Sequence, residues 1–159
     1  MNPDFRDMLS TLSAEGAEYL VVGAYALAAH GLPRATNDLD IRVGRTGDNP
    51  SRVFQALAPF GAPLERVSLD DLRKPDTVLQ VGVKPWRIDI LTAIDGVGFE
   101  EAWPARITVA IDQGLEVPVL SREHLTRTSV PSVGLRIWPM SPASRAIGRR
   151  RARQQVTSS

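Results

Sequence analysis

Segment 38–43 (DLDIRV) most constrains how this chain can fold, because polar and apolar residues alternate along it. Side chains of a β-strand alternate between two faces, so the segment predicts a strand with Asp38 and Asp40 on one face and apolar residues on the core face. Two carboxylates this close repel unless water or a cation screens them, and paired oxygen ligands suit Mg²⁺ in proteins that act on phosphates. The alternative is a polar edge strand that leans into solvent.

The residues before this strand predict a turn that a phosphate could approach. Residues 18–22 are expected to form a buried strand, and Gly23-Ala24 leads into a small-residue segment, 24–31, with good helix propensity. A glycine at such a junction lets a phosphate come close to the backbone, and the following helix offers unpaired N–H groups to an anion. The order is therefore strand, glycine turn, helix, acidic strand.

A third carboxylate lies in the apolar segment 86–91 (WRIDIL). Asp89 is costly inside such a strand unless another group pairs with it. With this residue, the pattern resembles the DNA polymerase β-like nucleotidyltransferase superfamily, in which Gly-Gly or Gly-Ser and a short helix precede Asp-x-Asp and a later third acid. Residues 21–43 and 86–103 are similar to small bacterial nucleotidyltransferases related to minimal nucleotidyltransferase antitoxins and AbiEii-type toxins. The resemblance covers residues 15–127.

The resemblance implies catalysis with two Mg²⁺ ions and a nucleoside triphosphate (NTP) as substrate. Asp38 and Asp40 would bind the ions, and Asp89 would ligate the catalytic ion or act as base toward the acceptor hydroxyl, so that pyrophosphate leaves. In this comparison the NTP-binding residues are Gly23, Ala24, Arg34 and Thr36. Ala24 departs from the pattern, since a second glycine or a serine is usual there. Arg34 would meet phosphate or pair with a nearby acid, and Thr36 would bond phosphate or simply end the turn.

Composition narrows the class of protein further. The 159 residues are 43% hydrophobic, enough for one domain with a core, and the lack of cysteine excludes disulfides and thiol chemistry. No apolar run approaches the length of a membrane span and the N-terminus lacks a secretory pattern, so we expect a cytoplasmic protein. His30 is expected to cap or pack at a helix end rather than ligate a metal.

The pattern of elements predicts an α+β or α/β fold, a mixed sheet flanked by helices, as in the nucleotidyltransferase fold. Helices are predicted at 4–14, 24–31, 50–59 and 69–73. Strands are predicted at 18–22, 38–44, 78–82, 86–92, 106–111 and 115–119.

Residues 128–159 differ in charge from the predicted nucleotidyltransferase domain, residues 1–127. No acid follows Glu123, and because the seven arginines beyond it contribute +7 to a net charge of +1, residues 1–123 carry −6. We expect a basic, disordered tail that could bind RNA or DNA through phosphates. A second hypothesis is that residues from Thr128 onward are a frameshifted version of the C-terminal segment seen in related proteins.

Three functional interpretations follow. The first is an Mg²⁺-dependent nucleotidyltransferase that modifies a protein or tRNA hydroxyl in a toxin–antitoxin or phage-defence setting, with a cognate toxin or antitoxin as partner. The second is a catalytically degenerate protein of the same fold that binds nucleotide or a partner. The third is a nucleic-acid-binding module in which the basic tail binds and the acids are structural.

Overall fold

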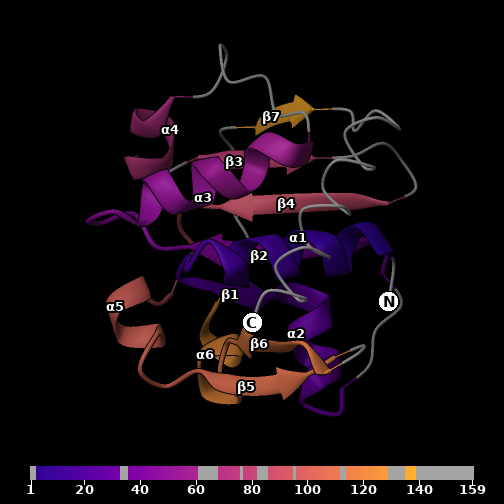
Figure 1. Ribbon diagram of the computed structural model, residues 1–159. Helices are drawn as coiled ribbons and strands as arrows, with labels where there is room; N and C mark the ends of the chain where they lie inside the picture. The colour runs from indigo at the N-terminus through magenta and orange to yellow at the C-terminus, as the bar shows by residue number, and fades with distance from the viewer. Residues whose placement is uncertain are drawn as a thin grey trace.

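One mixed β-sheet with helices packed against it makes up the computed structural model (Figure 1). Its strands, in the spatial order β5-β6-β1-β2-β4-β3-β7, are β1 (Tyr19–Val22), β2 (Asp38–Val43), β3 (Val78–Val81), β4 (Arg87–Leu91), β5 (Ile107–Ala110), β6 (Glu116–Val119) and β7 (Leu135–Trp138). The helices are α1 (Pro3–Ala14), α2 (Gly23–Ala29), α3 (Asn49–Leu57), α4 (Leu69–Arg73), α5 (Phe99–Ala102) and α6 (Arg122–Arg127), with a 3₁₀ turn at Ala58–Phe60. The structure describes residues 3–32, 36–60, 68–75, 77–81, 86–94, 96–111, 114–128 and 135–138.

The apolar face of β2 lies in the larger of two hydrophobic cores. Leu39, Ile41 and Val43 are fully buried there, together with Met8 of α1 and Val53 of α3. Burying a side chain of this size completely is worth about 1.5–3 kcal/mol relative to leaving it exposed. This burial confirms the alternation predicted for β2 and determines which of its faces carries the acids.

A second core lies partly on the other face of the sheet. It joins Leu20 and Val22 of β1 and Leu91 of β4 with Ala102 of α5. Leu91 shares its face with Asp89, because the two residues are two positions apart in one strand. The second core therefore covers the C-terminal end of β4, and Asp89 lies at the middle of that strand.

Each helix and strand predicted from sequence is present, with ends within two residues of the expected ones. Two short helices were not predicted. Helix α5 has four residues, and α6 begins after Ser121, whose hydroxyl accepts from the His124 amide. A single helical turn is too short to show a hydrophobic period, so its signal in the sequence is weak.

The structure also adds an element inside the predicted tail. Strand β7 pairs in parallel with β3, from Val78 opposite Leu135 to Val81 opposite Trp138. Four residues of the predicted tail therefore form a short strand along the edge of β3. The rest of the tail after Thr128 lies outside the described residues, and the frameshift hypothesis stays a prediction.

Among the described helices, none combines the length and the apolar character needed to cross a membrane.

Candidate active site

Strands β2 and β4 bring the three predicted carboxylates to one face of the sheet. The two strands run parallel, with Asp38 opposite Arg87 and Asp40 opposite Asp89. Residues paired across neighbouring strands point to the same face, so all four side chains gather on one side of the sheet. The shared face of Asp38 and Asp40 follows from alternation alone, whereas strand pairing places Asp89 beside them.

Asp40 and Asp89 lie opposite each other in β2 and β4, close enough for their carboxyl groups to influence each other's pKa. The pKa of Asp40 is raised to about 7, mainly by burial and to a smaller extent by the negative charges of Asp89 and Asp38. Burial also raises the pKa of Asp89, while the Arg87 guanidinium acts in the opposite direction. Burial and the neighbouring negative charges therefore favour the protonated form of Asp40.

The Arg87 guanidinium bridges two of the acids. Its Nη2 donates to Asp38 Oδ2 at 3.0 Å, and its Nε lies 3.3 Å from Asp89 Oδ1. Gln80 of β3 lies opposite Asp89, and with its amide oxygen turned toward Arg87 it accepts from Nε at 3.2 Å and from Nη1 at 3.3 Å. Arg87 is thus held by side chains from three adjacent strands.

Gly23 brings the start of α2 against the acids. Its φ of +67° lies in the left-handed region, which favours glycine. A Cβ at this position would collide with the carboxylate of Asp40, which pairs with the preceding Val22 across β1 and β2. The predicted glycine junction therefore lies beside Asp40. The half-buried Ala24 follows in the first turn of α2.

The three other residues considered from the sequence, Thr36, Arg34 and His30, have different outcomes. The Thr36 hydroxyl accepts from the Asp38 amide at 3.0 Å and is 3.3 Å from the Asp38 carbonyl, so Thr36 fixes the turn that leads into β2. A contact between Thr36 and phosphate stays a prediction. Arg34 lies outside the described residues. His30 is bonded through Nε2 to the Leu120 carbonyl at 2.9 Å, in agreement with a packing role.

The donor set suits a hard divalent cation, since three carboxylates on neighbouring strands supply oxygen ligands. The positions of these acids in the structure fit a metal ion less well than their chemistry does. Among the described side chains, no three of His, Cys, Asp or Glu are already grouped so that they could hold a metal ion. Arg87 contacts both Asp38 and Asp89, and it occupies oxygens that a cation would use. The metal roles of the three acids therefore stay predictions.

Arg87 and Gln80 were not predicted as site residues from the sequence. Arg87 is two residues before Asp89 in the same strand, so alternation places both on one face. Gln80 is the polar residue in the otherwise apolar β3, where it is buried. A polar residue in a buried strand is the signal that points to such a partner.

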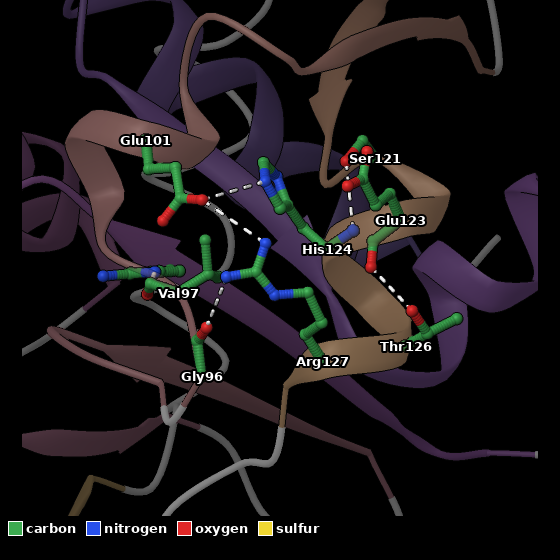
Figure 2. Close-up of polar contacts among 9 residues, drawn as sticks. Gly96, Val97, Glu101, Ser121, Glu123, His124, Thr126 and Arg127 are labelled. Atoms are coloured by element: carbon green, nitrogen blue, oxygen red, sulfur yellow. Dashed lines mark hydrogen bonds and ion pairs between the residues drawn. The ribbon is translucent and has the colours of Figure 1, made fainter.

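A second polar group on the molecule links α5 with α6 (Figure 2). Glu101 of α5 accepts from Arg127 Nη1 at 3.4 Å and lies 3.8 Å from Nε2 of the buried His124. Arg127 also donates to the Gly96 carbonyl at 3.4 Å. These contacts hold α6 to α5 and involve none of the three aspartates.

Comparison with known proteins supports the fold. No known protein family matches the sequence, and no curated protein does. Among solved structures, the chain is similar to a "putative nucleotidyltransferase" from Thermotoga maritima, with a TM-score of 0.53 at 16% identity. The alignment covers 97% of this chain and 88% of that chain. At this identity the likeness shows the fold alone, which is the predicted nucleotidyltransferase fold, a mixed sheet flanked by helices.

Proposed function

We propose that this protein is an Mg²⁺-dependent nucleotidyltransferase that transfers a nucleoside monophosphate from an NTP to a hydroxyl group and releases pyrophosphate. One observation carries the proposal: Asp38, Asp40 and Asp89 gather on one face of the sheet, and Gly23 lies beside Asp40. This juxtaposition occurs in a nucleotidyltransferase fold, where the resemblance predicted it.

The chemistry assigns a role to each acid. Asp38 and Asp40 would hold Mg²⁺, which when bound supplies positive charge to an in-line displacement at phosphorus. The acceptor oxygen forms a bond to the α-phosphorus as the bond to the pyrophosphate oxygen breaks. Asp89 would ligate the metal or accept the proton of the acceptor hydroxyl, and burial raises the pKa of its carboxyl group, which makes the carboxylate a stronger base.

The acceptor and the biological setting are a finer part of the proposal. The likeness of residues 21–43 and 86–103 to minimal nucleotidyltransferase antitoxins and AbiEii-type toxins supports a toxin–antitoxin or phage-defence setting. The acceptor would then be a hydroxyl of a cognate protein or of tRNA.

The test is transfer of label from each α-labelled NTP into total tRNA and bacterial lysate, with and without Mg²⁺. The intact chain is compared with Asp38→Ala, and with Asp70→Ala as a matched control, because the Asp70 side chain is 83% exposed on α4. We expect Mg²⁺-dependent labelling of one macromolecule that Asp38→Ala abolishes and Asp70→Ala retains. A folded protein that transfers none of the nucleotides would contradict the proposal and favour the catalytically degenerate interpretation.

A further inference from the structure

The Arg87 side chain, at the start of β4, contacts two of the three acids. Its guanidinium reaches Asp38 across the strand pair at 3.0 Å and Asp89 along its own strand at 3.3 Å. A planar guanidinium with five donors suits such a bridge, which a point charge on a lysine cannot reproduce. The side chain is about one-third exposed, and solvent can reach it.

The bridge uses oxygens that the proposed function requires elsewhere. A divalent cation held by Asp38 and Asp89 needs their oxygens at about 2.0–2.6 Å, and it repels a guanidinium bonded to the same groups. Arg87 and a bound cation therefore compete for Asp38 and Asp89. A residue that stabilises the cation-free arrangement lowers the apparent affinity for the cation by the same factor.

We infer that Arg87 is a positioning residue that holds Asp38 and Asp89 together before the divalent cation binds and releases them when it enters. The inference rests on the proposed function, since it concerns the same acids. It explains how Asp38 and Asp89 are held by one side chain without a cation, and it makes the strength of the Arg87 bridge a determinant of metal affinity.

Binding of Mn²⁺ alone tests the inference without a transfer assay. Free Mn²⁺ is measured by electron paramagnetic resonance during titration of the full chain, at mildly alkaline pH so that protons do not compete for the acids. Arg87→Gln, which loses the charge and the bridge, should bind Mn²⁺ about tenfold more tightly than the unchanged protein. Arg87→Lys should also bind more tightly, because it keeps the charge but loses the two-sided bridge.

Thermal unfolding provides the second readout. Without metal, Arg87→Gln should melt at a lower temperature, because the carboxylates lose their counter-charge, and saturating Mn²⁺ should raise its melting temperature more than that of the unchanged protein. A purely structural arginine would lower stability with and without Mn²⁺ alike. Arg52→Gln is the matched control, since this exposed arginine donates to the Gly16 carbonyl and should change neither readout.

The outcomes separate this inference from the proposed function. If the unchanged protein binds Mn²⁺, Asp38→Asn removes the binding and Arg87→Gln does not strengthen it, the inference is overturned while the metal site stands. If Arg87→Gln binds Mn²⁺ more tightly but Arg87→Lys binds it as the unchanged protein does, the positive charge alone lowers the affinity. The role of the two-sided bridge is then contradicted. If no folded variant binds Mn²⁺, the proposed function fails and the inference fails with it.

Discussion

The two ends of β2 carry charges of opposite sign on the same face of the sheet, and these charges differ in their burial and in the groups that they contact. At one end, Asp38 and Asp40 are half-buried, and the single guanidinium of Arg87 contacts Asp38 and Asp89. At the other end, Arg42 is 4% exposed, donates to the Val97 carbonyl at 2.7 Å and lies over the Phe99 ring at 5.6 Å.

The difference lies in how each charge is compensated. Burial, with a smaller contribution from Arg45, lowers the pKa of Arg42 to about 10, so the side chain stays a cation at neutral pH and is met by a carbonyl and an aromatic face. The acid end has more negative charge than its one arginine can neutralise. Excess charge of this kind is typical of ligand sites, whereas Arg42 packs against Phe99 of α5.

The largest expected effect separates activity from stability at the acid end. Asp40→Ala should reduce transfer at least about 100-fold, because it removes a proposed metal ligand. It should leave the melting temperature unchanged or raised, since it relieves the crowding of Asp40 against Asp89. Kinetics and circular-dichroism melting curves check both. Loss of folding together with activity would contradict a specifically catalytic role.

Gly23→Ala should destabilise the protein by about 2–4 kcal/mol, because it combines a positive φ with a collision against Asp40. Gly47→Ala is the control: its φ is +62° but nothing lies near the added Cβ, so only the backbone cost of about 1 kcal/mol should appear. Urea denaturation measures both. Equal losses would show that the approach of Gly23 to Asp40 is unimportant.

Arg42→Met should cost about 1–3 kcal/mol of unfolding free energy, because the Val97 carbonyl loses its donor and the Phe99 ring loses its cation. Transfer activity should persist, in contrast to Asp40→Ala. Arg45→Met, on the same segment, is the comparison. A loss of transfer activity in folded Arg42→Met would break the division of β2 into a structural and a chemical end.

The pH dependence of stability sharpens the contrast. The pKa of Asp40 is raised to about 7, so the folded protein keeps a proton that the unfolded chain loses near pH 4. The corresponding stability is fully present below the unfolded pKa and is lost as pH rises toward 7. Asp40→Asn should flatten this decline, as measured by urea denaturation at several pH values. An unchanged slope would place the titration elsewhere.

The smallest effect is expected between α5 and α6. Glu101→Gln removes the ion pair with Arg127 (Figure 2). Because the side chains of both residues are about half-exposed, the change in the free energy of unfolding should be about 0–1 kcal/mol. Added salt should reduce the difference further. Thermal melting at low and high ionic strength provides the measurement, and a salt-independent loss above this range would show that the pair acts as a buried one.

Much of the architecture was predictable because its signals are local. The alternation in β2 and the glycine that begins α2 depend on neighbours in the chain. Helix α5 and strand β7 were missed because one is a single turn and the other gains its partner only at the edge of β3.

The sequence by itself determined that Asp38 and Asp40 share a face and that Gly23 precedes them, since backbone geometry forces side chains two residues apart onto one side of a strand. Only the tertiary structure decided that Asp40 meets Asp89 and that Arg87 reaches Asp38 from 49 positions along the chain. The reason is that register between distant strands is set by how their apolar faces pack in a common core, a property of the folded molecule and not of either segment alone.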